Sequence, residues 1–534
     1  MSYLRCWWRY LLCLPAIQLH PAVSKVDMTR ENKELQAGTL PRFEPLEECF
    51  AVPPDDLDVK FDTDCGYVVV PEFYHGESNR ELKLGTMRLT TGHGKDRTPL
   101  FMYSGGPGQT QISSENFKLY QPEMLGGILA ERDIVLVEQR GVGHTDTLLD
   151  CPDFFSAAWA AYKQGLNAEE SATFQVEIIE NCIAGFKAQG INFDAYNDVE
   201  NAADVNAVRE ALGYDRIIFY GASYGTLLAQ HVMRDFPDIL EAVVMDGTVA
   251  LSRKSWVQYT AVDSQWGIDN LTKLCEADEK CRKAYDIPAL VDASLAHFDN
   301  GPLPYSYTNP DDPTLTIKGE LTKQDMAGLI HTFQGTGIQV SALPAILDQL
   351  VKGGAETAQE VLGEKKATDI IASRDATKGE EALLMHLAMV CSDDPVKSVD
   401  EVIMDGAGEY ARILGKEMAE AYITFCRLIN VKELPDSVDV NVTLDVPTLL
   451  LSGSLDVATP SLHSQPVVDA LPNATLLTFP GRTHVQIGNI NLCAAQIMTR
   501  FVLDPTTQLD TQCMVDAPKL QFVLPDGSMS GDAN

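Results

Sequence analysis

The stretch IIFYGASYGTLLAQ, residues 217–230, limits the possible folds more than any other part of the sequence. An apolar run typical of a β-strand enters the pentapeptide GASYG (221–225), and a helical pattern leaves it at once. In a strand–turn–helix unit of this kind, the glycines make room for a sharp elbow that exposes the serine hydroxyl. Alone, the pentapeptide also fits an ordinary turn. Ser223 is therefore a candidate nucleophile only if the chain also supplies a base and an acid.

Short β-rich runs alternate with helical patterns in both outer parts of the chain, which predicts an α/β fold with a mostly parallel sheet and helices on both faces. The runs 65–74 and 81–91 are predicted to open the sheet as an antiparallel pair. Between residues 251 and 440 the pattern becomes mainly helical. The other predicted strands are 99–108, 132–143, 217–222, 240–248, 445–460 and 474–484, and a helix is predicted over 196–214.

The predicted organisation is one α/β domain interrupted by a helical insertion. In sequence order we expect an export signal at 1–24, the first part of the core at 25–250, a helical cap at 251–440, the second part of the core at 441–515 and a loose tail at 516–534.

The chain is acidic, with a formal net charge of -35 over 534 residues. This argues against nucleic acid or an anionic membrane surface as the main partner, because both are polyanions. Arg5 and Arg9 precede or flank a short, mostly apolar stretch from Tyr10 to Leu19, and small residues follow at Ala22 and Ser24. That order is typical of an export signal, whereas a membrane span needs about 20 apolar residues. We expect a secreted or periplasmic protein without a stable membrane anchor.

The number of cysteines also fits an exported protein. Without Cys6 and Cys13, which lie in the predicted signal, ten remain, and they fall into couples adjacent in the sequence. An even number in an exported protein predicts five disulfides, although the sequence leaves their connectivity open; ten buried free thiols in a cytosolic enzyme are the alternative. No Cys/His cluster has metal-ligand spacing, so no metal is expected. The ten are Cys49, Cys65, Cys151, Cys182, Cys275, Cys281, Cys391, Cys426, Cys493 and Cys513.

An acid and a base follow later strands, as a serine nucleophile requires. The segment LLLSGSLDVATP (449–460) ends a strand and offers Asp456, and LLTFPGRTHVQIG (476–488) ends the last strand-like run and offers His484. The order Ser223, Asp456, His484 is the order of an α/β-hydrolase triad. Asp246, which also follows a strand, is the main rival for the acid. The rival histidines are His144, His231, His386 and His463.

The negative charge of the tetrahedral intermediate needs backbone donors. One is expected to be the N–H of Tyr224, the residue after the nucleophile. The other is expected from YSGGPGQTQ (103–111), where Gly105 and Gly106 let backbone amides approach and Pro107 stiffens the loop. A simple turn is the alternative for this loop.

Together these segments resemble the proline iminopeptidase and tripeptidyl aminopeptidase family of serine peptidases, a branch of the α/β-hydrolases. SGGPGQT (104–110) is similar to the family's oxyanion loop, and VEQRGVGHTD (137–146) to its Arg-Gly loop. GASYGTLLAQHVMRDFP (221–237) resembles its elbow, and VPTLLLSGSLDVATP (446–460) and GRTHVQIG (481–488) resemble its acid and histidine segments. The resemblance covers about residues 45–250 and 440–515, with the insertion matching only as a helical cap.

Family members remove residues from the free amino terminus of peptides, so the resemblance implies an anion that binds the substrate ammonium. Asp393 and Asp394 in MVCSDDPV are the candidates, with a solvated acidic turn before Pro395 as the alternative. Glu138 is a weaker candidate. The chain departs from the family pattern at Tyr103-Ser104, Glu138 and Thr145, which leaves the substrate open.

The resemblance implies an exported serine aminopeptidase of prolyl or tripeptidyl type that acts on peptides and needs no cofactor. A carboxylesterase on the same triad is the first alternative, because fold and triad do not set the leaving group. A non-catalytic binding protein on this scaffold is the second, and it would be expected to lack a triad member. The sequence leaves the number of residues released and the oligomeric state open.

Overall fold

A nine-stranded sheet organises the protein, in the strand order β1-β2-β3-β5-β4-β6-β7-β10-β11. The computed structural model describes residues 39–54, 57–94, 96–253, 255–335, 337–375 and 381–531. The strands are β1 Arg42–Pro45, β2 Asp62–Pro71, β3 Glu81–Thr90, β4 Leu100–Tyr103, β5 Ile134–Val137, β6 Ile217–Ala222, β7 Leu240–Asp246, β10 Thr448–Gly453 and β11 Ala474–Phe479.

The sheet has an antiparallel edge and a parallel remainder. Strands β1, β2, β3 and β5 pair antiparallel, which confirms the predicted opening hairpin, now preceded by β1. From β5 onward every neighbouring pair is parallel. The carboxyl ends of β6, β7 and β10 therefore meet at one edge of the sheet, where an α/β protein places its ligand or active site.

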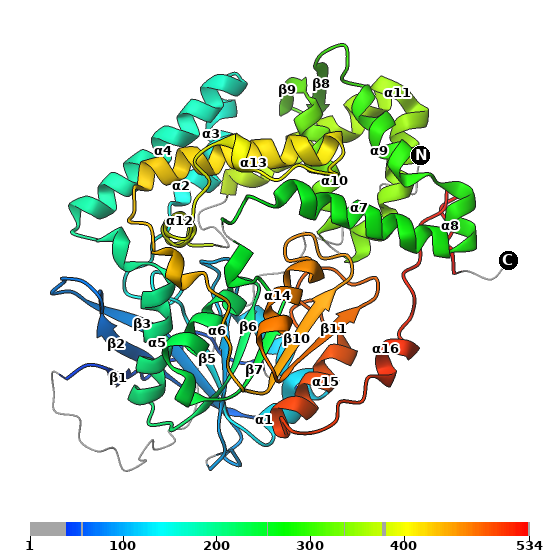
Figure 1. Ribbon diagram of the computed structural model, residues 1–534. Coiled ribbons are helices and arrows are strands. Elements are labelled where there is room, and N and C mark those ends of the chain that lie inside the picture. The colour runs from blue at the N-terminus through cyan, green and yellow to red at the C-terminus, as the bar shows by residue number, and fades with distance from the viewer. Residues whose placement is uncertain are drawn as a thin grey trace. The chain divides into compact units, whose positions relative to one another are not determined.

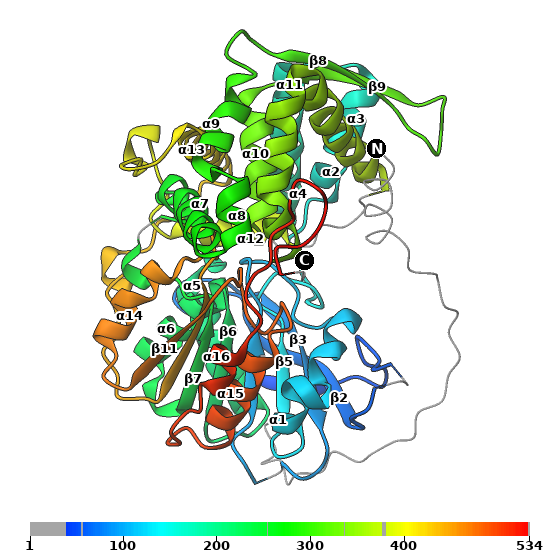
Figure 2. The same ribbon diagram turned by 90° about the vertical axis from the view of Figure 1, so that its right-hand side faces the viewer.

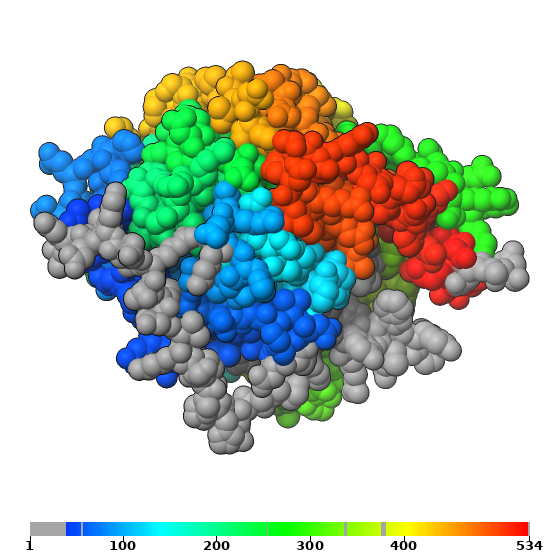
Figure 3. Space-filling model, turned by 90° about the horizontal axis from the view of Figure 1, so that it is seen from below, coloured from blue at the N-terminus to red at the C-terminus, as the bar shows by residue number. Residues whose placement is uncertain are grey.

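Helices cover both faces of the sheet, as predicted (Figures 1 and 2). Helices α5, α6 and α14 share one apolar cluster with the sheet, and α1 and α15 share another on the opposite face. Seen from below, α15 lies beside the segment that contains α1 (Figure 3). The core helices are α1 Gly127–Leu129, α5 Asp198–Ala211, α6 Tyr224–Asp235, α14 Gln465–Ala470, α15 Leu492–Leu503 and α16 Gln512–Asp516.

A mainly helical cap lies over the carboxyl edge of the sheet (Figure 1). It has its own apolar cluster, built by α7, α9, α10, α11 and α13. The cap helices are α7 Thr260–Ala277, α8 Glu279–Ala284, α9 Ile287–Ala296, α10 Lys323–Gln334, α11 Gly337–Ala372, which is kinked at Gly354, α12 Leu383–Ser392 and α13 Glu409–Ile429.

The cap differs from the prediction in two ways. First, its sequence includes an antiparallel hairpin, β8 Leu303–Thr308 and β9 Thr316–Leu321, which packs on α11. Second, helices α2 Pro152–Phe155, α3 Ala157–Gln164 and α4 Ala168–Ala188 precede the nucleophile in the sequence, yet α3 packs on α11 and α4 packs on α13. The helical layer therefore also draws on residues that the predicted boundary at 251 assigns to the core.

The predicted loose tail at 516–534 is wrong for the residues that the structure describes. Phe522 is fully buried in the apolar cluster of the cap. The carbonyl of Val523 accepts a hydrogen bond from the Tyr285 hydroxyl at 2.8 Å, and its N–H donates to the Ser341 carbonyl at 3.2 Å. In Figure 2 this segment runs from the core up to the cap. The buried ring of Phe522 and the two hydrogen bonds of Val523 anchor the segment.

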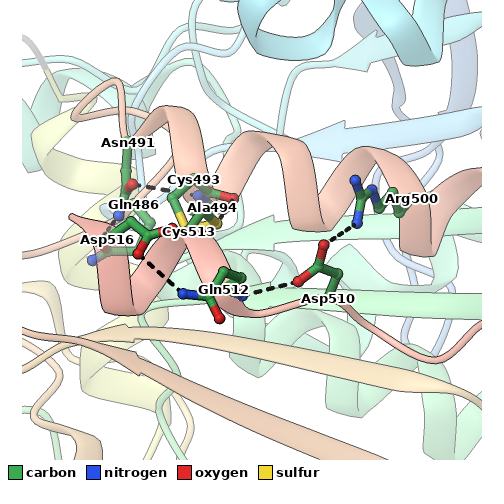
Figure 4. Close-up of a disulfide and its surroundings, with 9 residues drawn as sticks. All are labelled: Gln486, Asn491, Cys493, Ala494, Arg500, Asp510, Gln512, Cys513 and Asp516. Atoms are coloured by element: carbon green, nitrogen blue, oxygen red, sulfur yellow. Dashed lines mark hydrogen bonds and ion pairs between the residues drawn. A yellow bond between two sulfur atoms is a disulfide. The ribbon is translucent and has the colours of Figure 1, made fainter.

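Five disulfides join the predicted couples, and this excludes the free-thiol alternative. Figure 4 shows the bond that joins α15 to α16, with the Arg500–Asp510 ion pair beside it at 3.1 Å. The pairs are Cys49–Cys65, Cys151–Cys182, Cys275–Cys281, Cys391–Cys426 and Cys493–Cys513.

The predicted export signal at 1–24 lies outside the described residues. In the part that is described, every helix is too short or too polar to cross a bilayer.

Candidate active site

The nucleophile elbow forms where β6 ends and α6 begins. Ser223 is the only residue between them and has φ 53° and ψ -119°, a conformation that non-glycine residues rarely adopt. Its N–H donates to the Asp246 carbonyl at 2.8 Å, so the neighbouring strand β7 holds the turn in place. Backbone strain of this kind persists where the surrounding structure fixes it, and it is common at active sites.

Glycines are required two residues before and two residues after Ser223, because backbone carbonyl groups approach both positions closely. A Cβ on Gly225 would lie 3.0 Å from the Tyr103 carbonyl oxygen at the end of β4. A Cβ on Gly221 would collide with the Gly225 carbonyl. The GASYG pattern is therefore a steric requirement of this elbow, as the sequence predicted.

Asp456 and His484 form a hydrogen-bonded ion pair. Asp456 Oδ2 lies 2.9 Å from His484 Nδ1, and the carboxylate is fully buried whereas the imidazole is half-buried. The other carboxylate oxygen accepts from the N–H groups of Ala458 and Thr459, at 2.9 and 2.8 Å. Because a carboxylate only accepts, the Nδ1 of neutral His484 carries the proton and its Nε2 is left as a free base.

The electrostatics of this pair suit a general base. Burial alone would lower the pKa of His484, but the Asp456 carboxylate outweighs it and raises that pKa above its ordinary value. Burial would raise the pKa of Asp456, but His484 and the donors from residue 459 bring it below the ordinary value. Asp456 therefore stays ionised and stabilises the imidazolium that forms when His484 takes a proton.

Ser223 and the His484 ring border the same residue pair, Asp246 and Gly247. A Cβ on Gly247 would lie 3.1 Å from His484 Cε1. Gly247 directly follows Asp246, whose carbonyl accepts from the N–H of Ser223. Within the described residues no hydrogen bond joins the Ser223 hydroxyl to His484, and such contacts often tighten only when substrate binds.

Asp246, the rival acid, has a different role. Its carboxylate accepts hydrogen bonds from the N–H of Gln486 at 2.7 Å, the N–H of Ile487 at 2.8 Å and the Tyr220 hydroxyl at 3.0 Å. Burial raises the pKa of this carboxyl to about 6. The Asp246 carboxylate is thus hydrogen-bonded to backbone N–H groups that follow His484 in the chain. It makes no hydrogen bond to the imidazole in the described structure.

The loop that carries His484 needs this support. Val485 has φ 54°, which is costly for a β-branched residue. The two backbone bonds to Asp246 begin at the next residue and fix the loop in that conformation. Since the carbonyl of Asp246 also holds the N–H of Ser223, one residue positions both the elbow and the histidine loop.

The oxyanion loop, residues 105–109, lies directly against the nucleophile. A Cβ on Gly105 would come within 2.8 Å of Ser223 Cβ, and Gly106 has φ 105°. Tyr224 is the first residue of α6, so its N–H has no acceptor within the helix. Both predicted sources of oxyanion donors therefore border Ser223.

Replacing Gly105 with alanine is expected to lower kcat on the order of 10²–10³-fold, because the methyl group displaces the loop that supplies an oxyanion donor. Gly185→Ala in α4 is the matched control, since a Cβ there meets open space. Steady-state kinetics of both variants, with thermal unfolding to verify the fold, measure the effect. Equal kcat for Gly105→Ala and the wild-type protein would contradict the predicted loop geometry.

The four rival histidines have other surroundings or partners than Asp456 in the described structure. His231 is buried inside α6, where burial lowers its pKa to about 3. The other three bond elsewhere: His144 to the Ile112 carbonyl at 3.1 Å, His463 to Asp263 at 2.7 Å, and His386 to the Pro107 carbonyl at 3.0 Å and the Tyr422 hydroxyl at 2.7 Å.

Asp393 and Asp394 directly follow α12, at the end far from the oxyanion loop. Burial and the nearby Asp198 raise the pKa of Asp393 well above its ordinary value. Carboxylate oxygens of Asp394, Asp436 and Asp439 lie within 4.8 Å of one another. The two candidates therefore belong to a half-buried acidic cluster. Asp393 also interacts with Asp198, whose carboxylate accepts from the Tyr224 hydroxyl at 2.6 Å.

Glu138 is not placed to bind a substrate amine, and this prediction is wrong. The side chain is buried, and its carboxylate accepts from the Thr110 hydroxyl at 2.6 Å and the Gln111 N–H at 2.9 Å. Burial raises its pKa to about 7. Glu138 supports the segment that follows the oxyanion loop.

The sequence did not lead us to predict two further residues at the site. The Thr459 hydroxyl donates to Asp456 at 2.8 Å and lies 3.1 Å from His484 Nδ1, so it fixes both partners. Gln139 donates to the Ser104 carbonyl at 3.0 Å and supports the start of the oxyanion loop. Asp456 itself was the available signal, because an aspartate side chain often accepts from backbone N–H groups shortly after it, which brings Thr459 close to the carboxylate.

Comparisons with known proteins identify the family of the chain. Residues 98–488 match the family model described as the alpha/beta hydrolase fold. The chain is 29% identical over 219 residues to a tripeptidyl aminopeptidase of Streptomyces lividans, covering 40% of each chain. It is 26% identical over 463 residues to the serine protease Hip1 of Mycobacterium tuberculosis, covering 83% of this chain and 85% of that one.

Among solved structures, a proline iminopeptidase of Mycobacterium smegmatis is similar with a TM-score of 0.39 and 16% identity, covering 82% of this chain and 98% of that chain. The match to the Streptomyces relative is partial, since it spans 40% of that protein's length. The family model, in contrast, spans both core segments and the cap between them. The chain therefore belongs to the alpha/beta hydrolase fold family, as a hydrolase related to serine peptidases.

Proposed function

We propose that this protein is an exported serine peptidase that releases residues from the free amino terminus of peptides, of the prolyl or tripeptidyl type. The observation that carries the proposal is the Asp456–His484 pair, which lies against Gly247 beside the strained elbow of Ser223. The relatives named as a tripeptidyl aminopeptidase and a serine protease support a peptide substrate. The five disulfides support an extracytoplasmic location.

In the proposed reaction, His484 Nε2 takes the proton of the Ser223 hydroxyl as its oxygen attacks the scissile carbonyl. The N–H of Tyr224 and an N–H from Gly105 or Gly106 stabilise the oxyanion. His484 then gives the proton to the leaving amine, which leaves an acyl-enzyme for water to hydrolyse. Asp456 holds the imidazole in the tautomer that these reaction steps need.

The test compares prolyl and tripeptidyl arylamides that carry free or acetylated amino termini, with short acyl esters measured alongside. We expect turnover of a free-amine substrate, and acetylation is expected to lower kcat/KM on the order of 10²-fold, because it removes a buried charge pair. The preferred arylamide identifies the length of the released fragment.

Three outcomes contradict the proposal. Hydrolysis of esters alone would establish the carboxylesterase alternative. Equal cleavage of free and acetylated peptides would exclude an aminopeptidase and leave an endopeptidase. Absence of any hydrolysis, with a folded protein, favours the non-catalytic binding protein.

The acidic cluster of Asp393 and Asp394 remains our proposed site for the substrate ammonium. Its support is the concentration of carboxylates at the junction of α12 with the core. Asp393→Asn and Asp394→Asn are expected to raise KM for free-amine peptides while ester hydrolysis stays unchanged. Equal KM in the variants and the wild-type protein would place the ammonium site elsewhere.

A further inference from the structure

The oxyanion loop, residues 105–109, is bound to the cap by a continuous set of contacts. The Ala382 N–H donates to the Gly108 carbonyl at 2.9 Å, and Gln109 forms an antiparallel bridge with Glu381. Gly108 has φ 106°, and a Cβ there would lie 3.1 Å from the Ala382 carbonyl oxygen. The loop therefore packs tightly against the start of α12 at a position where the positive φ also favours glycine.

His386, one turn into α12, completes this junction. It is buried, and its Nδ1 lies 3.0 Å from the Pro107 carbonyl oxygen. A carbonyl only accepts, so Nδ1 carries the proton and donates. Burial lowers the pKa of His386 to about 4, so the ring is neutral at physiological pH and its Nε2 is an acceptor. The Tyr422 hydroxyl of α13, at 2.7 Å, is thus the donor to Nε2.

The two helices that hold this imidazole are also covalently joined. The Cys391–Cys426 disulfide links α12 to α13 beyond His386 and Tyr422. Cys426 lies four residues after Tyr422, on the same face of α13. The chain of contacts therefore runs from α13 through Tyr422 and His386 to Pro107, the middle of the loop that borders Ser223.

We propose that His386 is a positioning residue that sets the oxyanion loop by tying Pro107 to the cap helices α12 and α13. The cap then has a part in the rate of the chemical step, in addition to any contact with substrate. This inference rests on the proposed function, because it assigns a role within the same reaction.

The test uses three variants. His386→Leu removes both hydrogen bonds, Tyr422→Phe removes only the distal one, and His386→Asn keeps an amide N–H near the position of Nδ1. Since a displaced oxyanion donor typically costs about 10²–10³ in kcat, we expect His386→Leu to lower kcat about 10–100-fold with KM within about threefold. His386→Asn is expected to recover much of that loss, and Tyr422→Phe to lose a few-fold.

The loss is expected for arylamides and short acyl esters alike, because both reactions pass through an oxyanion. Rates are referred to active sites titrated with a fluorophosphonate, which bonds its phosphorus to the serine oxygen and releases fluoride. His331→Leu in α10, a partly buried cap histidine, is the matched control and is expected to keep the wild-type kcat. Thermal unfolding is measured for every variant.

Several results overturn the inference. They are a wild-type kcat per site in His386→Leu, a change confined to KM, or no recovery in His386→Asn. If His386→Leu does not fold, wild-type kcat in Tyr422→Phe overturns it. If the wild-type protein is labelled but hydrolyses no substrate, the proposed function fails and the labelling rates test His386. If Ser223 is not labelled at all, both proposals fail.

Discussion

Ser223→Ala is expected to lower kcat by about 10⁴–10⁶, since removing the nucleophile of a working triad abolishes the covalent route. The remaining rate comes from binding and the oxyanion loop alone. The substitution removes one oxygen at an elbow whose glycines and backbone bond to Asp246 stay in place. Stability is therefore expected to change little or to rise, because strained active-site positions are commonly held at a cost in stability.

The measurement is kcat on the preferred arylamide, with thermal unfolding to establish that the variant folds. Ser156→Ala is a useful partner, because Ser156 donates its hydroxyl hydrogen to the Asp153 carbonyl at 3.2 Å and has no contact with the triad or the oxyanion loop among the described residues. It is expected to retain most of the activity. Unchanged hydrolysis in Ser223→Ala would remove Ser223 from the mechanism and with it the proposed triad.

The sequence predicted the elbow and the segments around it because their signals are local. A strand period, a glycine pentapeptide and a helix period follow one another within 14 residues, 217–230. The choice between Asp246 and Asp456 as the acid of the triad cannot be made from such local signals. Both end parallel strands at the same edge of the sheet, so spacing cannot separate them. The decision depends on which carboxylate reaches His484 Nδ1 and which one is taken by backbone N–H groups.

The cap and the tail were predicted less well, for a related reason. Helical periodicity identifies an apolar face but not the body against which that face packs. Helix α4 carries a capping box and a helical pattern, yet its place beside α13 is a tertiary property. The same holds for His386, whose partner Pro107 is 279 residues away in the sequence. Such contacts follow from the docking of whole layers.

Asp456→Asn is expected to lower kcat about 10⁴-fold while the fold is retained. An amide is nearly the same size as a carboxylate and can still accept from the N–H groups of Ala458 and Thr459. It can also donate toward His484 Nδ1, which favours the wrong tautomer and puts the proton on Nε2. The base then has no free lone pair to accept the proton of Ser223.

The pH dependence gives this variant a second signature. In the wild-type protein the Asp456 carboxylate raises the pKa of His484 above the ordinary value of about 6.5. Only neutral His484 is a base, so kcat/KM is expected to rise through that raised pKa and to fall as pH drops below it. Without the Asp456 carboxylate, burial lowers the pKa of His484 and only the smaller effect of Asp246 opposes it, so the midpoint of the acid limb is expected to move to lower pH. An unchanged midpoint together with a small loss of kcat would assign the acid to another residue, and Asp246→Asn would then be the variant that shifts the profile.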